Sequence, residues 1–203
     1  MEPMFAPPLE ALVASLTRLP GIGRKGAQRI ALHLLQRQRS VGEKLAEHLS
    51  TALDTLQPCQ WCRTLSDTNP CQICSDPKRD AAQLCIVEEL ADQWALQRAT
   101  SFNGRYFVLN GRLSPLDGIG PEQLGLPILE ERLSQGEIKV VILATSGTVE
   151  GLTTAQWITD AAQRHDIKVQ RLAQGLPAGS ELDYLDNATL AAAFDFRTDQ
   201  ASR

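Results

Sequence analysis

Two closely spaced pairs of cysteines constrain the fold of this 203-residue chain more than any other feature of its sequence. Two residues separate the cysteines of each pair, and the four side chains are Cys59, Cys62, Cys71 and Cys74. Four thiolates can close a tetrahedral Zn²⁺ shell that leaves no position for water, so the sequence predicts one structural zinc per chain. The segment is too short to bury a core of its own, and metal binding would therefore fold it. Free thiols or a redox pair are the alternatives, and the clustering favours metal.

A glycine-rich turn between two amphipathic segments is the second strong pattern. Apolar residues recur at helical spacing in residues 8–19 and in residues 27–35, on either side of the turn. The turn ends where the second helix begins, and the free backbone N–H groups and the dipole of a helix N-terminus favour an anion. We therefore expect a DNA phosphate to be held there, without reading of the base sequence, by Gly21, Gly23, Arg24, Lys25 and Arg29.

The distribution of charge supports contact with DNA at one end of the chain. The formal net charge is −4, yet between Arg18 and Lys44 there are 7 Lys or Arg and a single acid. A basic patch on an acidic body is typical of proteins that touch nucleic acid locally. A solvated helix face is the alternative, which charge alone does not exclude. With a third helix expected from about residue 42, residues 1–57 form one predicted helical unit.

Beyond residue 83 the pattern changes to short apolar runs that alternate with helical stretches. The strand-length runs are residues 84–87, 106–109 and 140–143, with a further strand near Val169. Helices are expected at about 89–99, 127–135 and 153–165. Strands that alternate with helices predict an α/β layer with a mostly parallel sheet.

Neither a membrane span nor a signal peptide is visible in the sequence. The longest strictly aliphatic run, from Val140 to Ala144, is far shorter than the roughly 18 apolar residues that cross a bilayer. The N-terminus has an early acid and lacks the apolar stretch of a signal peptide. We therefore expect a cytoplasmic protein with no membrane partner.

These motifs, in this order, resemble the RecR recombination mediator family. The resemblance covers nearly the whole chain, and its landmarks are residues 19–30, 59–74, 86–88, 105–121 and 142–145 and the sequence Gly175-Leu-Pro177. It implies a helix-hairpin-helix DNA-binding unit at 1–57, a four-cysteine zinc finger at 58–75, a Toprim-like domain at 82–178 and a C-terminal segment at 179–203. An oligomer contact is the one role suggested for the last segment.

The resemblance also implies a function in recombinational DNA repair at gaps and breaks. Members of the family act with RecO, often also with RecF, to load RecA on DNA coated by single-strand-binding protein. They form dimers and ring-shaped tetramers that can encircle DNA. We therefore expect a nucleoid-associated homo-oligomer, with the tetramer favoured, that binds double-stranded, gapped or single-stranded DNA without sequence preference.

The Toprim resemblance raises the question of catalysis. Catalytic Toprim proteins bind Mg²⁺ through a Glu at the end of the first strand and an Asp-x-Asp pair after a later strand. Here Glu88 ends the first strand and Glu89 follows it, but the stretch after residue 144 has no Asp-x-Asp and one acid, Glu150. Without the Asp-x-Asp pair, these acids would bind Mg²⁺ only weakly. The family commonly has Asn-Pro where this chain has Ser146-Gly147.

We therefore predict a non-enzymatic binding platform rather than an enzyme. The acids Glu88, Glu89 and Glu150 would then form a surface for a basic partner such as RecO, or hold Mg²⁺ weakly. Two alternatives stay open. One is a Mg²⁺-dependent nuclease or topoisomerase-like Toprim enzyme with Glu88 as a metal ligand. The other is a pure protein-interaction adaptor whose basic patch touches only acidic partners.

Overall fold

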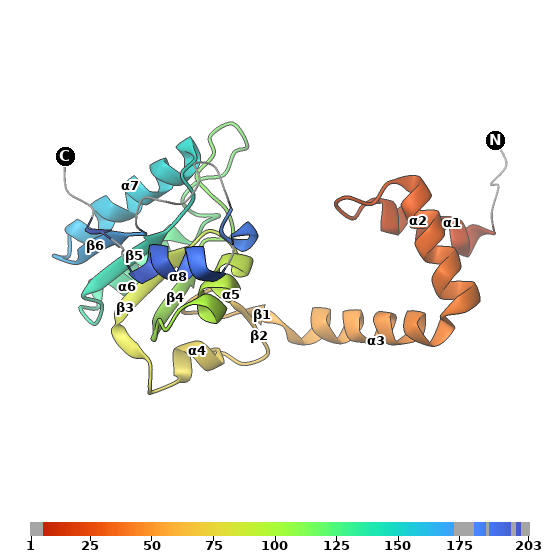
Figure 1. The fold of residues 1–203 in the computed structure, drawn as a ribbon, viewed down its shortest axis with the longest axis horizontal. Helices are drawn as coiled ribbons and strands as arrows, with labels where there is room; N and C mark the ends of the chain where they lie inside the picture. Colours follow the sequence, from red (N-terminus) through yellow and green to blue (C-terminus); the bar gives the residue numbers. More distant parts are fainter. Residues whose placement is uncertain (1–5, 173–180, 186, 196–197, 200–203) are drawn as a thin grey trace. The chain divides into compact units, whose positions relative to one another are not determined.

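The computed structural model describes residues 6–172, 181–185, 187–195 and 198–199, and the chain divides into two compact units, Met1–Thr55 and Leu56–Arg203. Figure 1 shows both units and labels their elements. The family landmark Gly175-Leu-Pro177 and the expected boundary at residues 178–179 lie outside the described residues. Among the helices of the described ranges, none combines the length and the hydropathy that a bilayer crossing requires.

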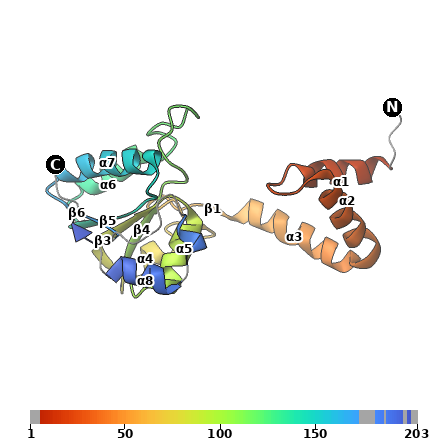
Figure 2. The ribbon, with the colours of Figure 1, turned by 45° about the horizontal axis from the view of Figure 1, so that its top comes forward.

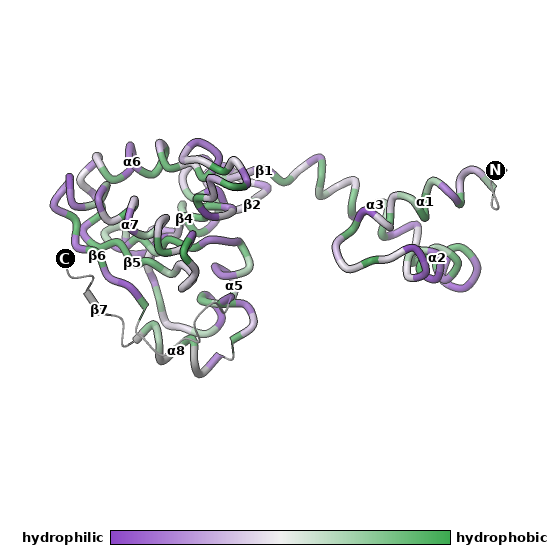
Figure 3. Tube along the Cα trace, turned by 90° about the horizontal axis from the view of Figure 1, so that it is seen from above, coloured by the Kyte–Doolittle hydropathy of each residue, from purple (hydrophilic) through white to green (hydrophobic). Residues whose placement is uncertain are grey.

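The first unit is entirely helical. Helix α1 (Pro7–Thr17) begins with a proline, which suits the first turn because its missing N–H has no partner there. Helix α2 (Arg24–Leu32) runs directly into a single π-helical turn, η1 (His33–Arg37), and α3 (Arg39–Thr55) follows. Val13 of α1 packs against Ala27 and Ala31 of α2, and these three side chains form a small core. Figure 3 shows hydrophobic and hydrophilic residues alternating along α3.

The second unit begins with the cysteine-bearing segment. Strands β1 (Gln57–Pro58) and β2 (Leu65–Ser66) pair antiparallel, and the short helix α4 (Gln72–Ser75) follows them. The Cys59–Cys62 pair lies in the turn between the two strands, and the Cys71–Cys74 pair lies at the start and inside of α4. The two cysteine pairs come from different local structures, a turn and a short helix, and the fold brings them together in one cluster.

A five-stranded sheet forms the body of the second unit. Its strands are β3 (Asp80–Val87), β4 (Gly104–Val108), β5 (Val140–Ala144), β6 (Lys168–Arg171) and β7 (Thr198–Asp199). Their order is β4-β3-β5-β6-β7, and every pair is parallel except β6 with β7. The prediction of an α/β fold with a mostly parallel sheet is confirmed.

Helices cover both faces of this sheet. Helices α6 (Leu126–Ser134) and α7 (Val149–Gln163) lie on one face, while α5 (Leu90–Ala99) and α8 (Asn187–Asp195) lie on the other, near the short helix η2 (Leu182–Tyr184) (Figure 2). Because successive strand residues point to opposite faces, Leu84 and Ile86 join the core beneath α6 and α7, whereas Cys85 and Val87 face α5 and α8. Burial on both faces explains why these strands read as continuous apolar runs.

Candidate functional site

The four cysteines form one buried cluster. All their Sγ atoms lie within 4.8 Å of one another, and those of Cys62 and Cys71 are 3.4 Å apart. Zinc–sulfur bonds of about 2.3 Å in a tetrahedral shell place sulfur atoms roughly 3.8 Å apart, so only small adjustments separate the cluster from a zinc site. The backbone N–H of Cys71 also points at the sulfur of Cys59, at 3.4 Å, as expected around a thiolate ligand.

The protonation of these thiols supports the same interpretation. A hydrogen bond from the Cys62 thiol, helped by Cys74, lowers the pKa of Cys71 to about 2. Hydrogen bonds with Cys62 and Cys71 raise the pKa of Cys74. Four thiolates so close together would repel one another, and a divalent cation offsets that repulsion. The donor set fits structural Zn²⁺, as the sequence predicts.

Two arginines that the sequence analysis did not single out fix the cysteine segment to the α/β domain. Arg63, at a positive φ of 62°, donates to the carbonyl oxygens of Leu109 at 2.8 Å and Gln123 at 2.9 Å. Arg132 of α6 donates to the carbonyl oxygen of Trp61 at 3.0 Å. A single arginine beside a cysteine carries no sequence signal of this role, because its carbonyl partners are far away along the chain.

The predicted phosphate site lies where α2 begins. Gly21 has a φ of 75°, which favours glycine, and Gly23 precedes the helix with no side chain to cap it. The first N–H groups of α2 are thus left without a side-chain acceptor and suit an external anion. Lys25 and Arg29 are exposed one helical turn apart. Arg24 is exposed as well, but its guanidinium also donates to Glu10 of α1 at 2.8 Å.

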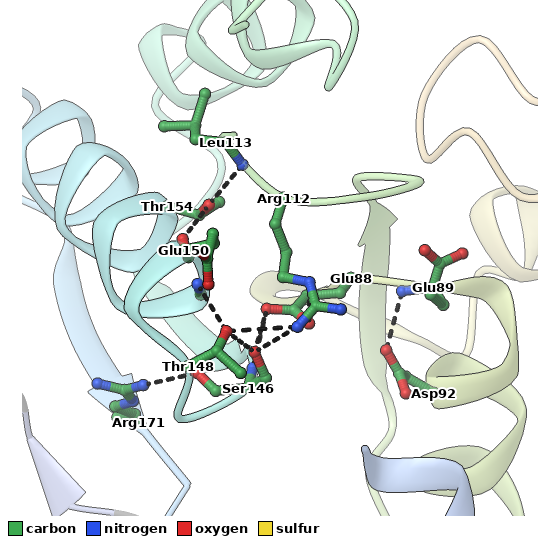
Figure 4. Close-up of polar contacts among 11 residues, drawn as sticks. Glu88, Glu89, Asp92, Arg112, Leu113, Ser146, Thr148, Glu150, Thr154 and Arg171 are labelled. Carbon is green, nitrogen blue, oxygen red and sulfur yellow. Dashed lines mark hydrogen bonds and ion pairs between the residues drawn. The ribbon is translucent and has the colours of Figure 1, made fainter. Parts of the chain in front are cut away.

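Glu88 lies at the end of β3, beside the end of the neighbouring strand β5. Its carboxylate is buried, and Oε1 accepts hydrogen bonds from the backbone N–H of Ser146 at 2.9 Å and from its hydroxyl at 3.0 Å (Figure 4). Arg112 Nε lies 3.6 Å from Oε2. Burial raises the pKa of Glu88, and the Ser146 hydrogen bonds and the charge of Arg112 oppose that effect.

The other predicted acids take different places. The side chains and backbones of Glu89 and Asp92 bond reciprocally in a capping box at the start of α5, and Glu150 is exposed in the first turn of α7. Within the described ranges, the four cysteines are the only group of three or more potential ligands close enough to hold a metal ion. Glu88, Glu89 and Glu150 therefore share an end of the sheet without converging on one point.

A pocket of about 230 Å³ opens beside Glu88. Its charged lining consists of Glu88, Glu89, Asp92, Arg112, Glu181 and Asp183. Burial, together with the charges of Glu88, Asp183 and Glu89, raises the pKa of Asp92 to about 7. Asp92 follows Glu88 by one helical turn, as the sequence indicates, whereas Arg112 carried no sequence signal of a role here, because only strand order brings the loop after β4 to Glu88 and the end of β5.

Family models match the chain in consecutive segments. They describe a RecR helix-hairpin-helix (residues 9–53), a RecR zinc finger domain with four cysteines (56–76), a Toprim domain (82–173) and a RecR C-terminal region (175–198). The zinc-finger match and the cysteine cluster together confirm the predicted structural zinc site.

Proteins named Recombination protein RecR are similar to this chain over nearly its full length. The protein of Xylella fastidiosa (strain Temecula1) is 50% identical over 191 residues, which cover 94% of this chain and 96% of that protein. The Methylococcus capsulatus protein is 51% identical over 188 residues, covering 93% and 95%. The Beijerinckia indica protein is 50% identical over 196 residues, covering 97% and 98%.

Proposed function

The chain belongs to the RecR family of recombination proteins, and from this premise we propose that it is a non-enzymatic, DNA-binding mediator of recombinational repair. In this proposal it acts with RecO, and with RecF where that protein takes part, to help load RecA at gapped or single-stranded DNA near the nucleoid. The observation that carries the proposal is the uncapped N-terminus of α2, flanked by the exposed cations Arg24, Lys25 and Arg29.

The N-terminus of α2 suits the DNA backbone better than a base edge. Its N–H groups and nearby cations match a phosphate, which every nucleotide presents, so binding should not depend on sequence. One hairpin makes only a few phosphate contacts and binds weakly alone. Several copies in an oligomer would add their contacts and raise the overall affinity.

A stripe of leucines on α3 supports the proposed homo-oligomer. Leu45, Leu49 and Leu53 recur at intervals of four residues, so they lie on one face of the helix, and they are 53%, 58% and 75% exposed. Within the described part of the chain, no residue of α3 is buried. An exposed apolar stripe of this kind is suited to packing against a second copy. We favour a tetramer, which light scattering of the full chain would detect.

The acidic pocket and the exposed Glu150 at the same end of the sheet support a docking role rather than catalysis. Glu89 and Glu150 are exposed and can contact a basic surface of RecO, whereas Glu88 is buried and holds Ser146 in place. Changing Glu89 and Glu150 to Lys should weaken RecO binding at least tenfold and leave DNA binding intact. Unchanged RecO affinity would place the docking surface elsewhere.

The DNA-binding proposal is tested by the salt dependence of affinity. Replacing Lys25 and Arg29 with Ala should weaken binding equally for unrelated duplexes and lower the slope of log K against log salt by about 2 for each hairpin that contacts the DNA. Replacing the exposed Lys78 and Arg98 of the second unit removes the same charge and should leave the slope unchanged. Equal slopes for both double variants would reject the assignment and favour the adaptor alternative.

A gel experiment with gapped DNA separates the proposal from the enzymatic alternative. A labelled gapped duplex with excess Mg²⁺ should shift on a native gel and run as intact strands on a denaturing gel. Strands that are cut or rejoined by the native protein, but not by a Glu88→Gln variant, would make the chain a Toprim enzyme.

A further inference from the structure

Two arginines contact the Glu88–Ser146 pair, but only one of them lies beside the Glu88 carboxylate. Arg112 crosses from the loop after β4, with Nε 3.6 Å from Glu88 Oε2 and a terminal nitrogen 3.3 Å from the hydroxyls of Ser146 and Thr148. Arg171 of β6 donates to the backbone carbonyl of Ser146 at 3.2 Å. Figure 4 shows Arg112 beside the Glu88 carboxylate and joined by dashed lines to Ser146 and Thr148.

This arrangement satisfies the carboxylate without a metal ion. Oε1 already accepts two hydrogen bonds from Ser146, and Oε2 faces the Arg112 guanidinium. Mg²⁺ requires near-octahedral oxygen ligands at about 2.0–2.1 Å, with several waters retained. An ion bound to Oε2 would lie beside the guanidinium, and the two positive charges would repel each other. The Glu88 site therefore does not fit the Mg²⁺ that a Toprim domain implies.

The surrounding chain is built to hold this compact contact. Gly151, in the first turn of α7, lies so close that a Cβ atom there would be 2.4 Å from the Ser146 hydroxyl and 2.8 Å from Glu88 Oε1. Thr148 caps the helix by accepting from the Gly151 N–H at 3.2 Å, and its hydroxyl also contacts Ser146 at 2.9 Å. Arg112 thus has fixed partners, the carboxylate of Glu88 and the hydroxyls of Ser146 and Thr148, and these hold its positive charge in one place.

We propose that the guanidinium of Arg112 is a built-in counter-cation that takes the place of a divalent metal at Glu88 and excludes such a metal from the site. The pocket then keeps a fixed arrangement in any concentration of divalent ions. Its remaining acids, Glu89, Asp92, Glu181 and Asp183, stay negatively charged overall for a basic partner. The inference rests on contacts among Glu88, Arg112 and Ser146 and does not require the proposed role in repair.

Mn²⁺ is the probe that tests this proposal, because free and bound ions are distinguished by electron paramagnetic resonance. The measured quantity is Glu88-dependent binding, the difference between zinc-loaded full-length protein and the same protein carrying Glu88→Gln. The native chain should show no difference at millimolar Mn²⁺. An Arg112→Met chain should gain close to one Glu88-dependent ion, and Arg112→Lys, which retains the charge, should gain none.

Two controls make the result specific. Arg164→Met removes an exposed arginine that pairs with Glu130, and it should gain no Mn²⁺. Zinc content and thermal melting report whether each variant folds, and Arg112→Gln replaces Arg112→Met if that variant does not. Mn²⁺ should raise the melting temperature of whichever variant with a neutral residue at position 112 folds, Arg112→Met or Arg112→Gln, by several degrees. It should leave the melting temperature of the native chain unchanged.

Either of two results would overturn the proposal. The first is Glu88-dependent Mn²⁺ binding by the native chain, which would mean that Arg112 does not exclude the metal. The second is no Glu88-dependent binding by any folded neutral variant at position 112. Because no DNA is present, failure here is distinct from failure of the DNA-binding proposal, which the salt slope measures.

Discussion

Glu88 Oε1 accepts hydrogen bonds from both the backbone N–H and the hydroxyl of Ser146, at 2.9 and 3.0 Å. The two residues are 58 positions apart in the sequence and lie at the adjacent ends of the parallel strands β3 and β5. A buried carboxylate thus ties these strand ends together and fixes the start of α7. Since the hydroxyl is one of two donors, its removal weakens the contact without abolishing it.

Ser146→Ala should therefore lower the free energy of unfolding by about 1–2 kcal/mol, the cost of a lost hydrogen bond to a buried charged group. Urea unfolding of the zinc-loaded protein measures this change. Ser134→Ala is the control, because the Ser134 hydroxyl donates to the carbonyl oxygen of Glu131 at an exposed position. Its effect should stay within about 0.5 kcal/mol. Equal losses in both variants would show that Ser146 and Glu88 do not form a stabilising pair.

Gly151→Ala should destabilise the protein although alanine favours helix. A Cβ atom at residue 151 would lie 2.5 Å from the Ser146 carbonyl oxygen and 2.4 Å from its hydroxyl, so the backbone must shift. Overpacking of this kind costs about 1–3 kcal/mol. The matched control is Gly26→Ala, because Gly26 is also the third residue of its helix and a Cβ there would meet only Ile22 Cγ2, at 3.7 Å.

Gly26→Ala should leave stability unchanged or raise it by up to about 1 kcal/mol, through helix propensity. Thermal melting of both variants compares the two positions directly. Similar melting temperatures for Gly151→Ala and Gly26→Ala would mean that α7 can move away from Glu88 at little cost.

Local patterns in the sequence predicted most of the fold because they report burial and backbone geometry. The apolar run at 84–87 became the central strand β3, and the four cysteines met as their spacing indicated. The run at 106–109 became β4 at Gly104–Val108, since a strand continues into residues that the apolar pattern does not mark. The third helix begins at Arg39, earlier than expected, because polar residues can start a helix.

Contacts between distant segments were not predictable in this way. Strand order places β3 between β4 and β5, and this order alone brings Arg112 and Ser146 to Glu88. Periodicity carries no information about order, and a single arginine in a glycine-rich loop has the composition of a surface residue. The position of Asp92 one turn after Glu88 can be read from the sequence, but its raised pKa depends on burial and on the charge of Asp183, which the fold brings near it.

Arg63→Lys should weaken the attachment of the zinc finger to the α/β domain. The planar guanidinium reaches two carbonyl oxygens, those of Leu109 and Gln123, and a lysine ammonium cannot reproduce that fork. We expect a loss of about 1–3 kcal/mol in unfolding free energy, as for lost hydrogen bonds to a charged group, and faster amide hydrogen exchange in residues 59–66. Arg98→Lys, at an exposed position of α5, should change neither measurement. Unaltered exchange in the Arg63 variant would show that other contacts hold the finger.

Cys62→Ser should lower the zinc content from one ion per chain to well below one. The cysteine cluster is buried, and among the described residues its candidate His, Cys, Asp and Glu ligands are the four cysteines alone, so the segment should unfold locally as the metal leaves. Cys85→Ala is the control, because Cys85 lies in β3 outside the cluster. Atomic absorption measures zinc in both proteins. Full zinc occupancy in the Cys62 variant would exclude a four-thiolate site.

Asp92→Asn should stabilise the protein increasingly as the pH rises from 5 to 8. Burial, with the charges of Glu88, Asp183 and Glu89, raises the pKa of Asp92 to about 7, whereas an Asp of the unfolded chain ionises near 3.9. The native state therefore holds an extra proton between about pH 4 and pH 7, and its stability falls across that window and levels off above it. An asparagine does not titrate, and its amide oxygen can still accept from the Glu89 N–H, which lies 2.8 Å from Asp92 Oδ2.

The stability difference between the Asp92→Asn and native proteins should grow by on the order of 2 kcal/mol between pH 5 and pH 8. Urea unfolding at four pH values measures it, with Gln97→Ala at an exposed, non-titrating position of α5 as the control, for which the difference should be constant. Parallel pH profiles for the Asp92 variant and the native chain would contradict the assignment. Asp92 would then ionise at the same pH in the folded and the unfolded chain.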